Sequence, residues 1–248
     1  MCNQELHLST MPVMSPVGAS DGRRTAAAAR RRTREQAILA ATRALFDEKG
    51  VAEARIDHIA DAVGINRAIV YRHFTGKDEM FALTLVGYLD ELAIELSAAA
   101  ARHESPRDQL AALTGAFCDY GLTHPAFVDC AQALMRRSGP DLIDELSEAA
   151  LLRLGRGISS CLTLLSATLE SGDESGDFAV DDPELLANTL YASGLGALQL
   201  ARVGILVKET APGVPSVGSV SPEQVKDYLV ASALALATAP VELRLRAR

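Results

Sequence analysis

Apolar residues recur at helical spacing along most of this chain. The clearest short example begins at residue 56 and holds its apolar side chains three or four positions apart: Ile56, Ile59, Ala60 and Val63. That spacing puts all four on one face of a short helix. Gly64 follows at once, where a helix end favours a residue that tolerates positive φ. The pattern therefore predicts an amphipathic helix that ends at this glycine.

A second short helix is predicted directly after the glycine. Ile65 is expected to pack back over the turn, and Val70 and Phe74, four residues apart, supply the apolar side of the helix. The rest of its surface carries Arg67, Ala68, Ile69, Tyr71, Arg72 and His73. A helix this short is not stable alone, so a scaffold must present it and leave its free face to a partner. Two short helices around one tight turn form a helix-turn-helix.

The free face of the second helix has the chemistry that double-stranded DNA requires. Arginine can donate two hydrogen bonds to guanine, and isoleucine or alanine can contact a thymine methyl group. Tyrosine and histidine can reach phosphates. The alternative is an ordinary helical bundle whose arginines are solvated, because apolar patterns of this kind are common in such bundles.

Further helices are predicted on both sides of the motif. Thr33 and Gln36 form a capping box, so a helix should run from Thr33 to Lys49 and end at Gly50. A long apolar helix should follow the motif from about residue 77 to 102. Capping residues followed by proline start three later helices, at Ser105-Pro106, Asp182-Pro183 and Ser221-Pro222. With breaks at His124-Pro125 and Gly139-Pro140, the remaining helices are expected at 107–122, 126–136, 141–170, 183–206 and 222–238.

The fold class follows from these patterns and from composition. Loops rich in Gly, Ser, Asp and Pro at 171–181 and 209–220 separate the last three helices, and no segment alternates as a strand does. Aromatic residues make up 4% of the chain, with no Trp, which favours helix over sheet. We therefore expect an all-α protein with about nine helices, in which a three-helix helix-turn-helix domain precedes a larger helical domain.

The net charge of −8 is unevenly distributed. Residues 21–80 hold twelve basic and nine acidic side chains, a net charge of +3, and the rest of the chain carries −11. A basic N-terminal part on an acidic body is the asymmetry expected of a DNA-binding protein with a regulatory domain. A difference of this size also arises by chance, so it only supports the motif.

A basic segment precedes the first predicted helix. It holds Arg23-Arg24-Thr25, four alanines, and then Arg30, Arg31, Arg32 and Arg34. Such a segment can neutralise phosphates or enter a minor groove, and the alternative is a solvated basic extension of the helix. Because residues 1–22 lack periodicity, we expect residues 1–32 to form a disordered basic arm. Residues 241–248 are expected to form a C-terminal tail.

Several distinct short motifs lie between Ile38 and Phe81. They are Ala44-Leu45-Phe46 with Gly50, Ile59-Ala60, Val63-Gly64-Ile65, Val70-Tyr71-Arg72-His73-Phe74 and Lys77-Asp78-Glu79. Together they resemble the DNA-binding domain of the tetracycline-repressor (TetR) family. Two positions depart from the family pattern. Arg55 stands where a Thr or Ser usually caps the first motif helix, and Asp57 stands where a basic residue is common.

The resemblance implies a function for each part of the chain. Residues 33–76 would be the helix-turn-helix DNA-binding domain, and residues 77–240 a helical effector-binding and dimerisation domain. The second motif helix would enter the major groove of double-stranded DNA, and Lys77 would hold a phosphate. The residues expected to contact DNA are Asn66, Arg67, Ala68, Ile69, Tyr71, Arg72, His73 and Lys77.

Small residues mark the predicted helix at 183–206, which includes Gly194 and Gly196 among leucines. Each interior glycine costs ~1 kcal/mol relative to Ala, and close approach of a second helix would offset that cost. The resemblance implies a four-helix bundle formed by this helix, the last helix and their copies in a homodimer. We expect Gly194, Gly196, Leu200 and Tyr228 at this interface, with packing inside the chain's own core as the alternative.

Family pockets open among the helices between the motif and the dimer helices, so the resemblance also implies an effector site. The residues expected to line it are Tyr88, Phe117, Tyr120, Phe127, Met135 and Leu152. Few charges fall on the inward faces, so the small-molecule effector should be hydrophobic. Arg136-Arg137 lies nearby and could meet an anionic group or simply be a solvated helix end. Ordinary core packing explains each of these residues as well.

No catalytic, metal-binding or membrane pattern emerges. Four cysteines lack C-x-x-C spacing, the histidines are scattered, and neither G-x-S-x-G nor a phosphate-binding glycine loop is present. No apolar run reaches the ~18 residues of a membrane span, and the N-terminus lacks a signal pattern. We therefore expect a cytoplasmic protein that is no enzyme, needs no cofactor or metal and has no membrane partner, with its cysteines as small buried side chains.

These inferences combine into one expected function, a dimeric transcriptional regulator that responds to a ligand. We expect a repressor that binds a palindromic operator and is released by a hydrophobic small molecule. Two alternatives stay open. One is an effector-independent DNA-binding protein whose body serves only dimerisation or protein partners, which the absence of a cavity would favour. The other is a helical enzyme that contains a similar helix pair, which would need an acid–base pair in a cleft.

Overall fold

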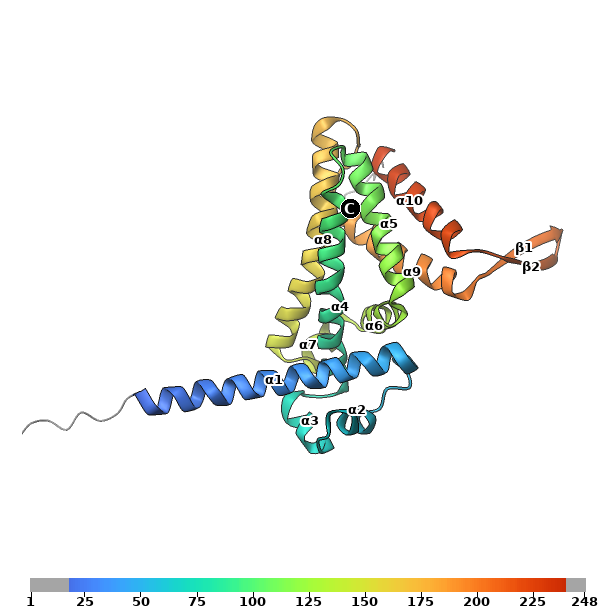
Figure 1. Ribbon diagram of the computed structural model, residues 1–248. Helices are drawn as coiled ribbons and strands as arrows, with labels where there is room; N and C mark the ends of the chain where they lie inside the picture. The colour runs from blue at the N-terminus through green and yellow to red at the C-terminus, as the bar shows by residue number, and fades with distance from the viewer. Residues whose placement is uncertain (1–17, 240–248) are drawn as a thin grey trace, which may run out of the picture.

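The computed structural model describes residues 18–239, with side chains from residue 24 onward. Within that part, the chain forms ten helices and one two-stranded antiparallel sheet (Figure 1). The N-terminal domain holds α1 (Gly18–Lys49), α2 (Ile56–Val63) and α3 (Arg67–His73). The body holds α4 (Lys77–Ala100), α5 (Pro106–Thr123), α6 (Pro125–Met135), α7 (Gly139–Glu145), α8 (Glu148–Ser175), α9 (Pro183–Val203), β1 (Ile205–Ala211), β2 (Val214–Ser219) and α10 (Pro222–Thr238). The predicted all-α class is confirmed, with the sheet as a minor addition.

The apolar spacing of the motif produces the core of the N-terminal domain. Ile59 and Ala60 from α2, Val70 from α3 and Phe74 just after it are all buried, and they pack in one cluster with Ile38 from α1. Short amphipathic helices are stabilised by burial of such a face rather than by propensity alone. The helices predicted on both sides of the turn are therefore confirmed.

The first helix is much longer than predicted. α1 begins at Gly18, so residues 18–32, expected in a disordered arm, are helical. Thr33 is no N-cap, because its hydroxyl donates to the carbonyl oxygen of Ala29 at 3.1 Å inside the helix. Alanine and arginine are strong helix formers, so the run before Thr33 continues the helix. Residues 1–17 and 240–248, which include the predicted C-terminal tail, lie outside the described residues.

The body is organised around α4, which α5 and α8 flank (Figure 1). The predicted helix starts are confirmed, since Ser105, Asp182 and Ser221 each accept a hydrogen bond from the backbone N–H three residues later. One apolar core runs from the N-terminal domain through α4 into the body. Its two rings Phe46 and Phe81 meet edge to face at 4.6 Å between centroids across that junction. A displacement of α4 would therefore reach both parts.

The helix predicted at 141–170 is two helices. α7 ends at Leu146, which is buried and extended (φ −107°, ψ 142°). Ser147 then caps α8, because its hydroxyl oxygen accepts from the backbone N–H of Ala150. Apolar periodicity carried the prediction across this break, although a serine before a glutamate is a helix-start signal.

The segment predicted as the end of one helix and a loop forms a β-hairpin instead. Gly204 ends α9 at φ +68°, and β1 and β2 then pair antiparallel around a turn that contains Gly213 at φ +77°. Both glycines adopt the left-handed conformation that other residues disfavour. The strands escaped prediction because their few β-branched residues stand among Pro, Gly and Ser. Within the described part, the expected nine helices and no strand become ten helices and one sheet.

No helix of the described part is long and apolar enough to cross a lipid bilayer.

Candidate nucleic-acid interface

The turn between α2 and α3 is fixed by backbone and side-chain hydrogen bonds. Gly64 adopts φ +68° and ψ 38°, and the N–H of Ile65 donates to the carbonyl oxygen of Ala60 at 2.9 Å. These features end α2 as a glycine-capped helix. Asn66 then starts α3, because its side-chain oxygen accepts from the N–H of Ala68 at 2.8 Å. Asn66 thus positions the helix, in addition to its predicted place at the DNA.

α3 turns Val70 into the core and leaves the rest of its surface facing outward. Arg67, Ala68, Tyr71 and Arg72 are exposed, while Ile69 and His73 are half-buried. The structure therefore brings the predicted DNA-binding residues of this helix together on one side of the N-terminal domain.

Two neighbours hold the side chain of Arg67. Its guanidinium donates to the Tyr71 hydroxyl at 3.2 Å and to the Asp57 carboxylate of α2 at 3.4 Å. The hydroxyl and ring of Tyr71, followed by the charge of Asp57, raise the pKa of Arg67 above its ordinary value. Asp57, one of the departures from the family pattern, thus orients an arginine at the surface. The other departure, Arg55, leaves α2 without a side-chain cap.

His73 lies where α3 meets α1. Its Nδ1 is buried and has no hydrogen-bond partner in the described part of the chain. Burial, together with the charges of Arg31, Arg34 and Arg72, lowers the pKa of His73, so the ring is neutral at pH 7. Arg31 and Arg34 of α1 and Arg72 of α3 are thus all near enough to this ring to affect its charge. A neutral imidazole can donate one hydrogen bond to a phosphate without adding charge.

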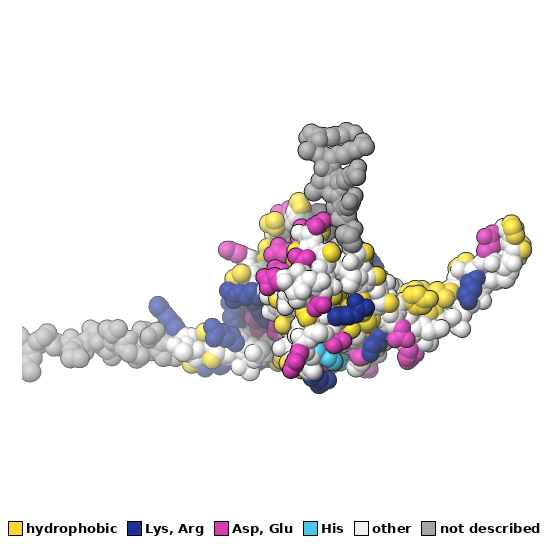
Figure 2. Space-filling model, turned by 90° about the horizontal axis from the view of Figure 1, so that it is seen from above, with side chains coloured by type: hydrophobic (Ala, Val, Ile, Leu, Met, Phe, Trp, Pro, Cys, Tyr) yellow, Lys and Arg dark blue, Asp and Glu magenta, His cyan; other side chains and the backbone are white. Residues whose placement is uncertain are grey.

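The four arginines of the predicted arm are exposed on α1, at Arg30, Arg31, Arg32 and Arg34. Between residues 24 and 239 none of them forms an ion pair. Figure 2 shows dark-blue side chains along the rod of α1 where it leaves the domain. The basic segment is therefore presented on a helix rather than on the disordered arm that was expected. Such unpaired guanidinium groups are available to phosphates.

Lys77 stands at the first position of α4 and is exposed. Its ammonium group lies 4.7 Å from the centroid of the Phe81 ring one turn later, a cation–π contact that directs the side chain along the helix. For the predicted phosphate contact, the Lys77 ammonium group would have to leave the Phe81 ring and rotate toward the DNA.

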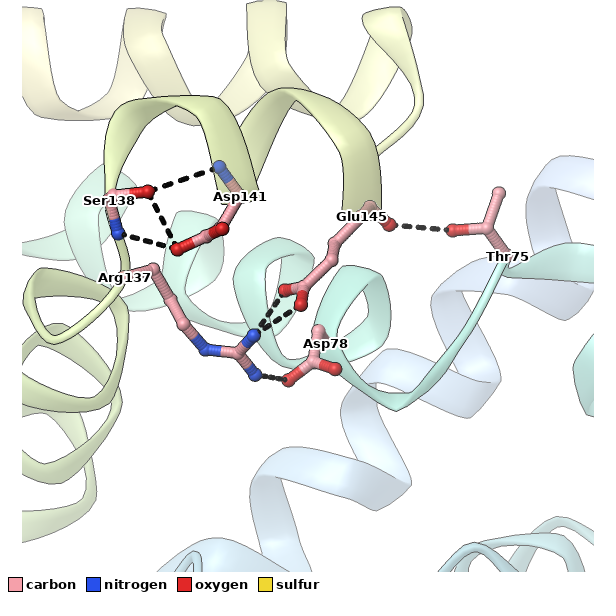
Figure 3. Close-up of polar contacts among 6 residues, drawn as sticks. All are labelled: Thr75, Asp78, Arg137, Ser138, Asp141 and Glu145. Carbon is pink, nitrogen blue, oxygen red and sulfur yellow. Dashed lines mark hydrogen bonds and ion pairs between the residues drawn. The ribbon is translucent and has the colours of Figure 1, made fainter.

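Arg137 joins three helices where the N-terminal domain meets the body (Figure 3). It follows α6, and its guanidinium contacts Asp78 at the start of α4 at 2.7 Å and both carboxylate oxygens of Glu145 at the end of α7. Thr75 adds a hydrogen bond from its hydroxyl to the backbone carbonyl of Glu145 at 3.2 Å. The pKa of Arg137 is raised by its hydrogen bonds to Glu145 and by the charge of Asp78. Arg137 is thus not a free solvated helix end, one of the two roles considered for it.

A buried carboxylate lies next to this cluster. Glu79 in the first turn of α4 accepts hydrogen bonds from the backbone N–H of Thr75 and from the hydroxyl of Ser147, the N-cap of α8. Burial raises the pKa of Glu79, but these hydrogen bonds outweigh that effect and the net pKa is lowered. One carboxylate therefore binds the N-terminal ends of two helices, the position that helix dipoles favour for a negative charge. This contact links the start of α8 to Thr75, in the segment that follows α3 along the chain.

Comparison with known proteins identifies the domain that carries this surface. Residues 38–83 match the model of bacterial regulatory proteins of the tetR family. Over 80 residues the chain is 34% identical to the HTH-type transcriptional regulator BetI of Brucella anthropi, which covers 32% of this chain and 41% of that protein. Residues 38–83 therefore form a DNA-binding domain of the tetR family type.

A second curated relative matches a segment of similar length. The HTH-type transcriptional activator FasR of Mycolicibacterium smegmatis is 31% identical over 87 residues, which cover 35% of this chain and 39% of that protein. The chain thus spans about two fifths of the length of the curated relatives it matches.

Several solved structures share the fold over most of the chain. RolR in complex with the ligand resorcinol gives a TM-score of 0.61 at 18% identity, covering 85% of this chain and 90% of that one. A bacterial regulatory protein of the tetR family from Rhodococcus RHA1 gives 0.59 at 17% identity, covering 83% and 97%. FadR from Bacillus subtilis in complex with stearoyl-CoA gives 0.58 at 11% identity, covering 81% and 98%. Likeness at these identities establishes the fold alone.

The body contains a small, partly open apolar cavity of about 50 Å³. Five helices line it with Leu92, Leu96, Leu113, Thr114, Phe117, Cys161, Leu162, Leu165, Leu190, Tyr191 and Leu229. Burial raises the pKa of Tyr191, so its hydroxyl stays protonated and no hydrogen bond within the described part perturbs it. The cavity therefore combines hydrocarbon walls with one phenol group that can serve as a polar contact.

Most residues predicted to line the effector site lie elsewhere. Of that set, only Phe117 borders this cavity. Tyr88, Tyr120 and Phe127 pack solidly in the core, where their rings contact one another, and the two tyrosines also form hydrogen bonds to their own chain. The predictions of Met135 and Leu152 are wrong for a different reason, because both side chains are 54% exposed. The cavity lies further from the DNA-binding domain, between the upper halves of α4 and α8 and the helices α5, α9 and α10.

The four residues predicted at the dimer interface fall into two groups. Gly194 is buried, and a Cβ atom built on it would lie 2.6 Å from Cε1 of Phe117 in the same chain. Its lack of a side chain accommodates an intrachain contact, so its assignment to the interface is wrong. Gly196 has open space around it, while Leu200 and Tyr228 are exposed, Tyr228 by 79%. These three positions stay predictions for a contact between subunits.

The cysteines of the described part behave as small hydrophobic side chains. Cys118, Cys130 and Cys161 are buried. Burial raises the pKa of Cys118 to about 11 and that of Cys130 and Cys161 to about 12, so all three stay as thiols at neutral pH. Thiols in this state are neither nucleophiles nor metal ligands. Cys2 lies outside the described residues.

Proposed function

We propose that this chain is a dimeric, ligand-responsive transcriptional regulator that binds DNA through α3. The observation that carries the proposal is the exposed face of α3, where Arg67, Tyr71 and Arg72 stand beside basic side chains of α1. A helix that buries only Val70 and points its polar face outward from a rigid domain has the geometry of a recognition helix.

The DNA contacts are proposed from the position of each side chain. Arg67 and Ile69 on α3 would contact base edges in the major groove. Tyr71, Arg72, His73 and Lys77 would contact the phosphate backbone. Asn66 would set the start of the helix, and Ala68 would allow close approach to a thymine methyl group. In a two-fold dimer the same set occurs twice, so the operator would be a palindrome with half-sites separated by whole turns of the double helix.

The effector is proposed to be a hydrophobic small molecule with one polar group. The apolar cavity with Tyr191 on its wall supports this class of ligand. Family structures from the same fold contain resorcinol in RolR and stearoyl-CoA in the Bacillus subtilis FadR. At about 50 Å³ the cavity of this chain is too small for such a ligand, so binding would have to widen it.

The need to widen the cavity suggests how the switch would work. Its walls include α4. In the first turn of α4, Asp78 is linked to α7 through Arg137, and Glu79 accepts a hydrogen bond from the N-cap residue of α8. A ligand that separates the helices lining the cavity would favour a second arrangement of the body. α4 would then carry the displacement to the DNA-binding domain. We propose that the expanded state has the two recognition helices at a spacing that operator DNA does not accept. The chain would then act as a repressor that the ligand releases.

An effector-independent DNA-binding protein is the second candidate function. The small volume of the cavity favours it, because a body without a ligand would serve only dimerisation or another protein. A helical enzyme finds no support within the described residues, where no group of His, Cys, Asp and Glu could hold a metal ion and the buried cysteines remain protonated.

The decisive experiment isolates genomic DNA fragments with the purified full-length chain and sequences them. A shared palindromic site, confirmed by gel shift, is the expected result. Lipophilic compounds are then screened for a rise in melting temperature and for release of that site. Absence of any enriched sequence would contradict the DNA-binding function. An enriched site that no stabilising compound releases would leave the effector-independent function.

A further inference from the structure

The β-hairpin between α9 and α10 projects sideways from the body (Figure 1). Its strands pair in register, with Val207 opposite Val217 and Lys208 opposite Ser216. The N–H of Val220 donates to the carbonyl of Gly204 at 3.1 Å and closes the base of the hairpin. Beyond that base the hairpin makes little contact with the body. An isolated two-stranded hairpin has marginal stability in water, so this one is expected to find cover elsewhere.

The two faces of the hairpin differ. On one face, Gly218 leaves space that the aliphatic stem of Lys208 fills, with the Lys208 Cε atom 3.2 Å from the position of a Cβ on the glycine. That face is covered by the hairpin's own side chain. On the other face, Val207 and Val217 form a directly opposed pair, and they are 78% and 74% exposed. We call this the bare face of the hairpin. An opposed pair of valines stabilises a sheet mainly when another surface packs on it.

Further exposed apolar side chains lie at the base of the hairpin and on the helices that carry it. Ile205 at its base and Val203 at the end of α9 are exposed, as are Leu200 on α9 and Tyr228 on α10. Figure 2 shows yellow, hydrophobic side chains where the arm leaves the body and near its tip. A concentration of exposed apolar side chains in one part of a protein surface is typical of a protein contact site.

The charge of the hairpin argues against nucleic acid as its partner. Between residues 205 and 220 there are one basic and one acidic residue, Lys208 and Glu209, and the Glu209 carboxylate accepts a hydrogen bond from the N–H of Gly213 at the turn. DNA-binding segments need several unpaired basic groups, as on α1. The hairpin can therefore contribute binding energy mainly through apolar burial.

We propose that the bare face of the hairpin, with Val207 and Val217 at its centre, packs against a second copy of this chain in a dimer. The hairpin is inserted between α9 and α10, the helices that the proposed dimer would bring together, so its base lies at that interface. A strand of seven residues extends about 20 Å, nearly twice the diameter of a helix, and so reaches past the first partner helix. Two-fold symmetry makes the contact reciprocal, and each subunit clasps the other.

The inference rests on the dimer of the proposed function, so its test measures dimerisation and DNA binding separately. The full-length chain is compared with the double variant Val207→Asp/Val217→Asp by sedimentation over a range of concentrations. Charges at these positions would be desolvated against the partner. We expect the dimer dissociation constant to rise at least tenfold, while the circular dichroism spectrum and melting temperature of the dilute protein are unchanged.

The matched control is Lys208→Asp on the opposite face of the same hairpin, which changes the charge by more than either valine substitution. It should leave the dimer dissociation constant unaltered. Equal weakening by Lys208→Asp would show a charge effect and overturn the inference. If the aspartate variant loses its fold, the test uses Val207→Thr/Val217→Thr instead, because threonine has nearly the volume of valine. This variant should raise the dimer dissociation constant about threefold.

The remaining outcomes separate the two proposals. A wild-type chain that dimerises and is insensitive to both valine variants overturns the hairpin contact and leaves the proposed function standing. A wild-type chain that sediments as a monomer at all concentrations, with or without operator DNA, overturns both. Retained binding of an isolated half-site by Val207→Asp/Val217→Asp, with weaker binding of the whole palindrome, confirms that the hairpin acts through dimerisation.

Discussion

The guanidinium group of Arg43 in α1 donates two hydrogen bonds to the carboxylate of Glu91 in α4, both at 2.5 Å. Around this pair, the Tyr120 hydroxyl donates to the carbonyl oxygen of Tyr88 at 2.9 Å, and the Tyr88 hydroxyl donates to Asp47 at 2.7 Å. Arg43 also lies over the Tyr88 ring, 4.2 Å from its centroid. The DNA-binding domain is thus fixed to the body by a network of charged and phenolic groups on three helices.

This network makes a testable contribution to stability. The hydrogen bonds from Arg43 lower the pKa of Glu91 despite partial burial. A lowered carboxyl pKa stabilises the folded state above the ordinary value of about 4.3, and that stabilisation is lost as the pH falls through the lowered value. Glu91→Gln should therefore lower the free energy of unfolding at pH 7 by about 1 kcal/mol, a modest figure because the carboxylate is half exposed.

Urea titrations at several pH values measure that contribution. The difference between wild type and Glu91→Gln should shrink as the pH falls below the ordinary carboxyl pKa of about 4.3 and through the lowered pKa of Glu91. The control is Glu95→Gln. Glu95 lies one turn further along α4, and its exposed carboxylate forms no ion pair in the described part of the chain. This substitution should change the free energy of unfolding little at any pH. A Glu91→Gln effect that stays constant from pH 3 to 7 would show that the ion pair is not its origin.

The DNA-binding face predicts different effects for two neighbouring side chains. Arg67→Ala removes a group positioned for base contacts, so affinity for the operator should fall about tenfold or more and base preference should relax. Tyr71→Phe removes a hydroxyl that is proposed to contact a phosphate, so it should weaken all sequences alike, by a smaller factor. Gel-shift titration against the operator and its single-base variants measures both.

The control for these variants is Arg102→Ala, which removes an exposed arginine beyond the end of α4, far from the motif. It should bind the operator as wild type does. Unchanged binding by both Arg67→Ala and Tyr71→Phe would exclude α3 as the recognition helix.

The arginines on α1 should act through phosphate charge. Replacing Arg31 and Arg34 together with alanine should reduce the slope of log affinity against log salt by about 2 if each neutralises one phosphate. The fold should survive, since alanine is a good helix former and both side chains are exposed. A double variant with the wild-type salt slope would show that these guanidinium groups stay in solvent.

The motif could be predicted from sequence because its determinants are local. Ile59, Gly64, Val70 and Phe74 lie within sixteen residues, and helical spacing plus one left-handed glycine define both helices and the turn. The order of later helices followed from serine or aspartate caps before proline. The length of α1 was missed because a capping pattern at Thr33 also fits the middle of a helix that starts earlier.

The candidate effector site could not be predicted in the same way. Tyr88 and Tyr120 look like pocket residues along the chain, but hydrogen bonds to groups 41 and 29 residues away place them in the junction with the DNA-binding domain. Spacing gives the face of a helix but not the helix that covers it. Tyr191, which lines the cavity, stands in a segment whose small residues suggested a dimer interface instead.

Two glycines of α9 should respond differently to the same substitution. Gly194→Leu inserts a side chain where Phe117 already lies, so it should lower the free energy of unfolding by about 1–3 kcal/mol. Gly196→Leu meets open space within the chain, so stability of the monomer should be unchanged while the proposed dimer weakens. Thermal unfolding and light scattering separate the two effects. A stable, fully dimeric Gly196→Leu variant would place this glycine outside the interface.

The buried carboxylate of Glu79 offers a test of how the body supports the DNA-binding domain. It accepts from the backbone N–H of Thr75 and the hydroxyl of Ser147, and it is 4% exposed. Glu79→Gln keeps the size but turns an amide N–H₂ group toward one of these donors, which leaves that donor unpaired. We expect a loss of about 1–3 kcal/mol of stability at pH 7. Because α8 and the segment after α3 are then less firmly joined, release of DNA by a ligand should require a higher ligand concentration.

The pH dependence of Glu79→Gln identifies the cause of that loss. Hydrogen bonding lowers the pKa of Glu79 below its ordinary value. Its stabilisation is therefore complete above about pH 4.3 and is lost as the pH falls through the lowered pKa, so wild type and variant should converge in acid. Glu104→Gln, which alters an exposed carboxylate just before α5, should unfold as wild type does throughout. If the Glu79→Gln difference instead persists undiminished at pH 3, lost packing rather than the charged hydrogen bonds explains it.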